Sequence, residues 1–530
     1  MSTSTPIFLD QTRRFLALLS VSVPSFMINL DANIVAVSLP SIARSTRGDF
    51  AAIEWVISSY TLTFGCLVLP AGALADRYGR KRILLVGLSI FTLSSFLCGV
   101  APSIAALNGS RALEGVGAAL LLSASLAVLS HGFSGADRSR AFAFWGMMVG
   151  IAIAIGPIAG GIVTQTFGWR WAFCINLPVG LVVIPLVLCT VVESTDPDTG
   201  HVDVSGFILF SGGVFTLIFA LISGNTRGWL SPPVTLSFAC AAGLLIGFLV
   251  AEARQSRPMV DLHLFRRRTF LGVNIAALAF AATLLTMLAY LPIFFQGALD
   301  RDPLQAGLLM LPLGVPLIVV PRMVAVRLTK RLTGRALLTT GLLLISTGFI
   351  ALAIAVPFFN YVTLIAGLLA AGVGAGMLNS EVVKVGMTVV PAERAGMASG
   401  VSGTVRFTGV VIGFAALGAV FATRVTAVLR PGLNSLGLAV SGGGYAALVR
   451  RVVAGDLSGA VSSAPETIRN QLHTVVMTSF GAGFQAILLA AAAFAALSAL
   501  LTWALVRQQD TAPVEPTSRT LSPEAFISTE

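Results

Sequence analysis

The chain has 530 residues, of which 56% are hydrophobic and only 11% are charged. A soluble domain carries roughly 25% charged residues, so this chain has too few charges to cover a surface that faces water. Its formal net charge of +11 lies in short segments between apolar runs, without interleaved aromatic residues, as in the loops of membrane proteins. The composition therefore favours a polytopic membrane protein over a soluble enzyme or a nucleic-acid-binding protein.

The apolar runs, taken in chain order, are long enough to be transmembrane helices. A helix needs about 20 apolar residues to cross a bilayer, and about fourteen runs reach that length. We therefore expect an all-α integral membrane fold. The predicted spans cover residues 15–39, 54–75, 82–101, 105–129, 141–165, 171–192, 204–223, 233–252, 269–296, 304–325, 336–356, 361–389, 397–422 and 479–506.

Two polar connectors divide these spans into groups. The first, Glu193–Asp203, is acidic and rich in turn residues, and the second runs from Ala251 to Arg268. In the longest polar segment, the apolar spacing of Tyr445–Val453 is compatible with a short amphipathic helix. The predicted organisation is a cytoplasmic tail over 1–14, a six-helix bundle over 15–195, a two-helix insert over 196–265, a second six-helix bundle over 266–507 with an outer loop over 424–478, and a disordered cytoplasmic tail over 508–530.

A glycine- and arginine-rich motif follows the second predicted span, Gly72-Ala-Leu-Ala-Asp-Arg-Tyr-Gly-Arg-Lys-Arg82. Its glycines permit a tight turn between antiparallel helices, and its carboxylate can accept backbone N–H groups at a helix end. A positively charged loop with a turn glycine would share some of these features, but the whole pattern resembles the loop 2–3 signature of the major facilitator superfamily. The resemblance implies a gating role for Gly72, Asp76, Arg77, Gly79, Arg80 and Arg82.

Four further segments resemble motifs of the fourteen-span drug:proton antiporters of that superfamily: Leu30–Pro40 in the first helix, Leu107–Ala118 in the fourth, Gly150–Gly161 in the fifth and Trp169–Gly180 at the start of the sixth. In the second half of the chain the likeness is weaker. The resemblance implies two six-helix bundles around a central cavity, two inserted helices, and alternating access driven by protons.

The fifth-helix motif also has a direct physical interpretation. Glycines let a neighbouring helix approach closely, and a proline removes one backbone donor and bends the helix. Helix packing alone would explain the pattern, and so would a seam that closes one face of a carrier. The residues concerned are Gly150, Gly156, Pro157, Gly160 and Gly161.

Ionisable residues inside predicted spans are the strongest indication of a site, because each costs at least about 2.5–3.5 kcal/mol at the bilayer centre. Asp31, Arg111 and Glu114 lie at similar depths below the same membrane surface, and Arg111 and Glu114 share one helix face. Glu114 stands where many relatives of the resembled branch have Gln. We expect these residues to couple protons to transport; a fixed ion pair of Arg111 with one acid is the structural alternative.

A second polar set lies in the other half of the chain. Glu381 and Lys384 are one helical turn apart, and Arg406 lies at a depth similar to that of Glu381. A structural ion pair of Glu381 with either cation is at least as well supported as a role in proton transfer. The sequence has no phosphate-binding loop, no metal-ligand spacing and no catalytic constellation, so we expect no enzyme activity, no cofactor and no direct use of ATP.

The combined hypothesis is a proton-coupled antiporter that exports drugs or amphipathic, cationic small molecules. Its partners would be the substrate, protons and the lipid bilayer, without nucleic acid. The alternatives are a lipid or dedicated-metabolite exporter, a proton-coupled importer, and a membrane sensor or scaffold. The sequence leaves open whether a periplasmic adaptor is a further partner. The expected location is the cell inner (cytoplasmic) membrane, as a multi-pass protein.

Charge asymmetry predicts that both termini are cytoplasmic. An even number of spans places both ends on one side, and roughly twice as many basic residues fall on that side as on the other. A reporter that is active only in the cytoplasm, fused after Arg507, should therefore be active. Activity of a periplasm-specific reporter at the same position would reverse the orientation.

Overall fold

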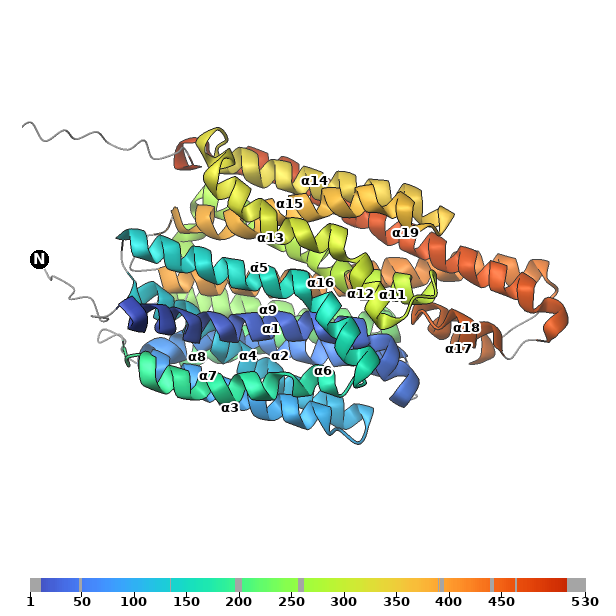
Figure 1. Ribbon diagram of the computed structural model, residues 1–530, viewed down its shortest axis with the longest axis horizontal. Coiled ribbons are helices and arrows are strands. Elements are labelled where there is room, and N and C mark those ends of the chain that lie inside the picture. The colour runs from blue at the N-terminus through green and yellow to red at the C-terminus, as the bar shows by residue number, and fades with distance from the viewer. Residues whose placement is uncertain are drawn as a thin grey trace, which may run out of the picture.

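The computed structural model describes residues 11–46, 50–133, 135–195, 203–255, 262–388, 390, 395–438, 443–462 and 465–511. Within these ranges the protein is helical without strands, and its helices form one elongated bundle (Figure 1). Thirteen described helices are long and apolar enough to cross a membrane, and α12 with α13, bent by 45°, form a fourteenth span if counted as one. The predicted all-α membrane fold with about fourteen spans is confirmed.

The α-helices of the described ranges have the following bounds: α1 Gln11–Thr46, α2 Phe50–Tyr78, α3 Arg80–Gly99, α4 Ile104–Gly132, α5 Gly135–Thr166, α6 Trp171–Cys174, α7 Asn176–Thr190, α8 Val204–Arg227, α9 Pro232–Arg254, α10 Arg268–Phe280, α11 Thr286–Gly297, α12 Pro303–Leu309, α13 Leu311–Val326, α14 Gly334–Ala355, α15 Tyr361–Thr388, α16 Ala395–Ser435, α17 Gly443–Val453, α18 Leu457–Ser462 and α19 Glu466–Leu505. A π-helical turn, Ala281–Leu285, joins α10 to α11 within one span.

The two ends of the bundle differ in the helices that lie there (Figure 1). One end holds the start of α1 and the end of α19, and we call it the terminal end. The opposite end holds α17 and α18, and we call it the distal end. Under the predicted orientation the terminal end is cytoplasmic.

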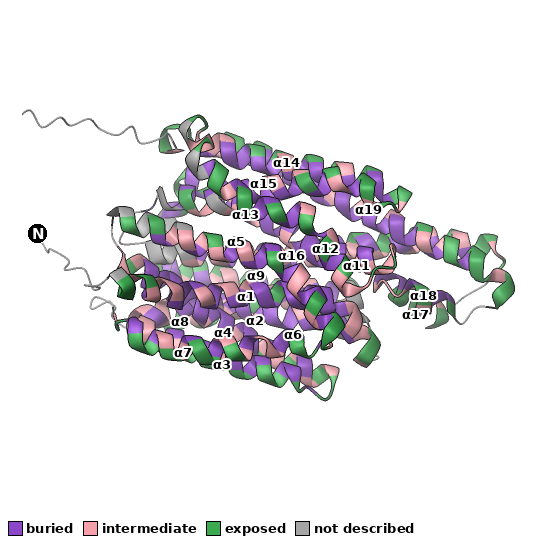
Figure 2. Cartoon of the chain, viewed as in Figure 1, coloured by how far each residue is buried: buried purple, intermediate pink, exposed green. Residues whose placement is uncertain are grey.

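Large apolar side chains cover the outside of the bundle, where Figure 2 shows exposed residues along the helices. Leu181, Val182, Leu236, Ile354 and Leu500 are each 63–70% exposed. A surface of this kind would be unstable in water because it is too large and too apolar. The hydrocarbon chains of a bilayer would cover it, which agrees with the membrane-spanning length of the helices.

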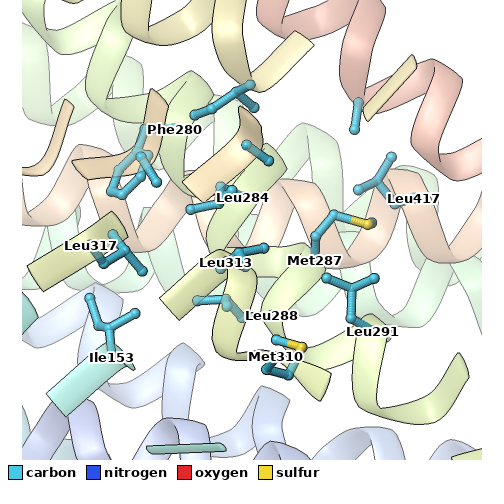
Figure 3. Packing of buried hydrophobic residues seen from close by; sticks show 14 of the residues in the cluster. Ile153, Phe280, Leu284, Met287, Leu288, Leu291, Met310, Leu313, Leu317 and Leu417 are labelled. Carbon is cyan, nitrogen blue, oxygen red and sulfur yellow. The ribbon is translucent and has the colours of Figure 1, made fainter. Parts of the chain in front are cut away.

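Helix α5 joins the first group of helices to the second. In Figure 3, Ile153 of α5 lies beneath Leu317 of α13, and Leu313, also of α13, lies nearby. All three belong to one buried cluster that continues through both halves of the chain. The two halves are therefore packed directly on each other along α5 and α13.

The two inserted helices lie beside a second contact between the halves. A Cβ atom at Gly65 of α2 would be 3.4 Å from Ile218 of α8 and 3.8 Å from Phe407 of α16. Apolar residues of α2, α8, α9 and α16 form one buried cluster. Helix α8 thus packs across the line where α2 of the first half meets α16 of the second.

The segment 424–478, which the sequence analysis assigned to an outer loop, is largely helical. Helix α16 continues to Ser435, and α19 already begins at Glu466, so both extend at the distal end (Figure 1). The helix suggested by the apolar spacing of Tyr445–Val453 is present as α17. The Tyr445 hydroxyl donates to the Thr426 carbonyl at 3.3 Å, which ties α17 to α16.

The two tails fall almost wholly outside the described residues, which begin at Gln11 and end at Thr511. The short described part of the second tail, Gln509–Thr511, is a 3-10 turn. It lies against the bundle, because the Thr269 hydroxyl donates to Asp510. The predicted disorder of 508–530 stays a prediction beyond Thr511.

Candidate functional site

The three ionisable residues predicted to share one depth meet inside the first half of the chain. Arg111 Nη1 on α4 lies 2.6 Å from Asp31 Oδ2 on α1 and 2.7 Å from Glu114 Oε2 on its own helix. The arginine is 1% exposed and both acids are 0% exposed. We call Asp31, Arg111 and Glu114 the buried ion cluster. The structural alternative of one isolated pair is not what forms, since the guanidinium contacts both acids.

Polar neighbours complete the hydrogen bonding of the two acids. Asn176 Nδ2, at the start of α7, donates to Asp31 Oδ1 at 3.1 Å and to Ser95 Oγ on α3 at 2.9 Å. The Ser95 hydroxyl in turn donates to Glu114. A continuous chain therefore links the two carboxyl groups on the side away from Arg111. Sequence reasoning missed Asn176 and Ser95. The one available signal was that Asn176 is a polar residue within the sixth-helix motif Trp169–Gly180.

The guanidinium is held by α2 as well as by the acids. Arg111 Nε donates to the Val56 carbonyl at 3.1 Å, and its Cζ lies 4.2 Å from the centroid of the Tyr60 ring. The ring of Phe173 lies 5.7 Å away on a third side. A cation enclosed in this way cannot be hydrated, so its attraction to the two carboxyl groups is little screened.

Charge balance defines what the buried ion cluster can do. One guanidinium neutralises one carboxylate, so the cluster carries a net charge of −1 when both acids are ionised. An uncompensated charge in a buried site costs several kcal/mol. The cluster is neutral only when one of the two acids carries a proton.

The loop motif at the terminal end forms the expected tight turn between α2 and α3. Gly79 has a backbone φ of +112°, a conformation that favours glycine. The sequence analysis expected Asp76 to accept backbone N–H groups. Among the described residues, its Oδ1 instead binds Arg80 Nη2 at 2.7 Å and Arg80 Nε at 2.9 Å. Arg77 packs over the ring of Tyr78 at 5.5 Å. Gly72 lies inside α2, and a Cβ there would meet nothing within 4 Å. Space therefore does not require glycine at this position.

Glu193, from the acidic connector after α7, takes the place that Asp76 had been assigned. Its carboxylate accepts the backbone N–H groups of Lys81 at 3.1 Å and Arg82 at 3.2 Å, and lies 3.7 Å from Arg82 Nε. A Cβ at Gly79 would be 2.6 Å from this carboxylate, so any larger residue would displace the Glu193 side chain. An anion at a helix N-terminus is favourable. Sequence reasoning missed this pairing because 111 residues separate Arg82 from Glu193.

Two glycines of the fifth-helix motif face α1. A Cβ at Gly156 would lie 2.4 Å from the Cβ of Asn33, and one at Gly160 would lie 2.9 Å from the Cα of Ile34. Any larger residue would push the helices apart. This face of α5 therefore packs within the first half of the chain.

The other motif residues face the second half. A Cβ at Gly150 would lie 3.3 Å from the Leu317 carbonyl, and one at Gly161 would lie 2.4 Å from the Pro303 carbonyl. The Pro157 carbonyl would in turn lie 2.3 Å from a Cβ at Gly307. We call this contact of α5 with α12 and α13 the glycine seam. It joins the two halves backbone to backbone; that this contact closes one face of a carrier stays a prediction.

In the second half, Glu381 pairs with Lys384 and not with Arg406. Lys384 Nζ lies 3.5 Å from Glu381 Oε1, whose side chain is 3% exposed. Arg406 has no ion pair with any described residue within 4.0 Å, and its Cζ lies 5.7 Å from the centroid of the Phe280 ring. The structure thus keeps the Glu381–Lys384 pair that helical spacing suggested and leaves Arg406, which depth alone had added, outside it.

Within the part of the chain that the structure describes, two cavities lie between the halves. The distal cavity, about 610 Å³, is bordered by α1, α2, α11, α16 and α17, and Ser58, Tyr290, Tyr445 and Arg450 are among its polar lining residues. The central cavity, about 80 Å³, is bordered by α1, α4, α5, α10, α15 and α16 and includes Arg406. Neither Asp31 nor Glu114 lines either cavity.

A bundle of about fourteen spans, with ionisable residues buried inside it and cavities between two halves, defines a membrane transporter. The sequence matches the family described as the Major Facilitator Superfamily over residues 21–414. The chain belongs to this superfamily, and the resemblance seen in its motifs is confirmed.

Relatives of similar length include resistance and efflux proteins. The chain is 37% identical to the multidrug resistance protein Stp of Mycobacterium tuberculosis, with 79% of this chain and 78% of the relative covered. It is 32% identical to the puromycin resistance protein pur8 of Streptomyces alboniger, with 79% and 84% covered. In fold it is similar to a bacterial homologue of the human lysosomal transporter Spinster, with a TM-score of 0.64, 15% identity, and 96% of this chain and all of the other covered.

Closure of the glycine seam can be tested at Gly161. Leucine there would meet the Pro303 carbonyl, and overpacking of this kind costs about 1–3 kcal/mol. In a variant whose five own cysteines are replaced, Ser58→Cys in the distal cavity should then react faster with a water-soluble maleimide. Gly146→Leu, on the same helix with nothing within 4 Å of its Cβ position, should leave the rate unchanged. Equal labelling with Gly161→Leu would show that the seam does not control access.

Asp76→Asn should impair transport more than binding. The amide keeps the size of the side chain but loses its ionic attraction to Arg80, which is only 11% exposed. A change of ~1.4 kcal/mol between two conformations corresponds to about a ten-fold change in their ratio. Transport should fall by that order, while substrate affinity in detergent stays within about two-fold. Arg254→Gln, at an exposed arginine outside the motif, is the control. Parallel loss of binding and transport would contradict a gating role.

Proposed function

We propose that this protein is a proton-coupled antiporter that exports drugs or other amphipathic small molecules across the inner membrane by alternating access. The observation that carries the proposal is the buried ion cluster, in which two acids share one arginine. The names of the relatives support drugs as cargo, since they include multidrug resistance, puromycin resistance and a drug efflux pump.

The cluster supports proton coupling because its stable charge differs between two environments. Sealed from water, as here, it is neutral only with one proton on Asp31 or Glu114. If water reached it, the acids would be hydrated and that proton could leave. A conformational change that opens and closes the cluster would therefore release and bind one proton per cycle.

Helix α2 gives a physical link between the cluster and the cargo route. The Val56 carbonyl accepts the hydrogen bond from Arg111. The next two residues, Ile57 and Ser58, line the distal cavity. A movement of α2 that widens or narrows this cavity would change the position of the carbonyl that holds Arg111. The proton-binding acids and the distal cavity would then respond to the same helix.

The glycine seam supports alternating access. Close contact between α5 and the α12–α13 pair lets two rigid halves meet without interlocking side chains. Such a contact can separate at small cost when the halves rock. Export from a cytoplasmic terminal end toward the distal end is the direction that the predicted orientation gives.

The predicted attraction of a cationic cargo by Asp31 stays a prediction. In this conformation the acid is fully buried and lines neither cavity. Export of a lipid or dedicated metabolite remains the alternative cargo, and the tests below separate coupling from cargo identity.

Asp31→Asn should abolish proton-driven export. The substitution leaves Arg111 facing a single acid, so the cluster is neutral without a bound proton. In cells that lack other pumps, retention of a fluorescent drug should rise to the level of cells without the protein. A protonophore should raise retention in wild-type cells and have no effect in the variant. Surface expression and thermal stability of the purified variant would confirm that it folds.

Proton release from purified protein on addition of drug gives the matching direct measurement. Wild type should release protons, and neither Asp31→Asn nor Glu114→Gln should, because either substitution leaves Arg111 facing a single acid. Ser125→Ala, a buried polar residue on α4 outside the cluster, is a matched control. Undiminished release and efflux in Asp31→Asn would place coupling elsewhere.

A further inference from the structure

The central cavity lies where a cargo would pass between the halves. It is bordered by α1, α4 and α5 of the first half and by α10, α15 and α16 of the second. Trp145, Phe280 and Phe407 supply aromatic walls, and Asn29 and Asn379 supply polar groups. An apolar pocket with a few converging polar groups is typical of small-molecule sites.

Arg406 is the one charged residue among the described residues that line this cavity. The Arg406 side chain is partly buried, and a cation withdrawn from water is normally paired with an acid, because an unpaired one is costly. Arg406 has no such partner within 4.0 Å among the described residues. Glu381, the acid nearest in depth, is held by Lys384 at 3.5 Å and does not line the cavity. The N–H donors of this guanidinium are therefore available to a bound molecule in the cavity.

The distal cavity has the same charge character. Its lining contains Arg450 and no acid among the described residues, while most of the remaining wall is apolar. Tyr290 and Tyr445 also line it, and the Tyr445 hydroxyl donates to the Thr426 carbonyl. Each of the two described cavities thus has one arginine and no acid in its described lining. The acids that would attract a cation, Asp31 and Glu114, are closed off beneath α2 by the ring of Tyr60 and the Arg111 side chain.

We propose that Arg406 forms a subsite for an anionic group, such as a carboxylate, sulfonate or phenolate, on an amphipathic aromatic cargo. The planar guanidinium suits such a group because it offers several donors in a fixed geometry. The aromatic walls would hold the planar apolar body of the same molecule. This inference rests on the proposed transport function and replaces its cationic cargo by an anionic one.

The size of the central cavity indicates in which conformation of the transport cycle the cargo binds. About 80 Å³ is well below the volume of sites that enclose drug-sized molecules. The cavity must therefore widen as α15 and α16 move away from α4 and α5. The anionic group would first meet Arg406 in that wider state, and the distal cavity of about 610 Å³ could hold the cargo after the halves rock.

The test compares two dyes that share a xanthene ring and differ in charge. Fluorescein is an anion, and an esterified rhodamine is a cation. Binding of each to purified protein in detergent is measured by fluorescence anisotropy, without a proton gradient. Wild type should bind fluorescein at least about ten-fold more tightly than the rhodamine, because a charge-assisted hydrogen bond is gained only by the anion. Arg406→Gln should remove this preference, and Arg406→Lys should retain part of it.

Arg424→Gln, an exposed arginine on the same helix that lines neither cavity, is the matched control and should keep the preference. Tighter binding of the rhodamine by wild type, failure of wild type to bind either dye, or equal loss of both dyes in Arg406→Gln would overturn the proposal. Asp31→Asn should keep the preference for fluorescein even if it transports nothing. Loss of proton coupling and loss of anion selectivity are therefore separately observable.

Discussion

The arrangement of the first half depends on one arginine shared by two acids. Arg111 binds Asp31 at 2.6 Å and Glu114 at 2.7 Å with all three side chains buried. Breaking a buried ion pair by removing one partner typically costs about 3–5 kcal/mol, so α1 and α4 must keep their depth and rotation relative to each other. Asn176 adds α7 to the same constraint, and the Val56 carbonyl adds α2.

The two faces of α5 extend this constraint to the rest of the molecule. Gly156 and Gly160 fix α5 against α1, which carries Asp31. Gly150 and Gly161 bring the same helix against α12 and α13 of the second half. A change in the position of α1 is therefore passed to the seam between the halves through one helix. The physical basis is contact between backbones, which transmits displacement because no flexible side chain lies between them.

The sequence alone was sufficient to predict features that depend on short stretches of the chain. Span lengths follow from apolar runs, and the meeting of Asp31 with Arg111 could be anticipated because residues at equal depth in a bundle can reach one another. Depth does not give the angle around the bundle, which is why Arg406 was grouped with Glu381 although Lys384 holds that acid. The cap of α3 by Glu193 could not be foreseen, since a helix N-terminus accepts any nearby anion and only the fold decides which one arrives.

The boundaries at the distal end show a different limit. Helices α16 and α19 run through residues that are polar enough to be assigned to a loop. Beyond the apolar core of a bilayer, a helix no longer needs a continuous apolar run, so hydropathy marks where the membrane ends and not where the helix ends. The same extension places α17 against the distal cavity, which a loop of unknown path would not have suggested.

The central claim is that Asp31 and Glu114 together hold one proton when the cluster is closed. Infrared spectroscopy tests this most directly, because a protonated carboxyl group has a C=O stretching band that an ionised carboxylate lacks. Purified protein at neutral pH should show such a band in a difference spectrum against the Asp31→Asn, Glu114→Gln double variant. A difference spectrum without a protonated carboxyl band would mean that both acids are ionised beside Arg111, and it would contradict the account.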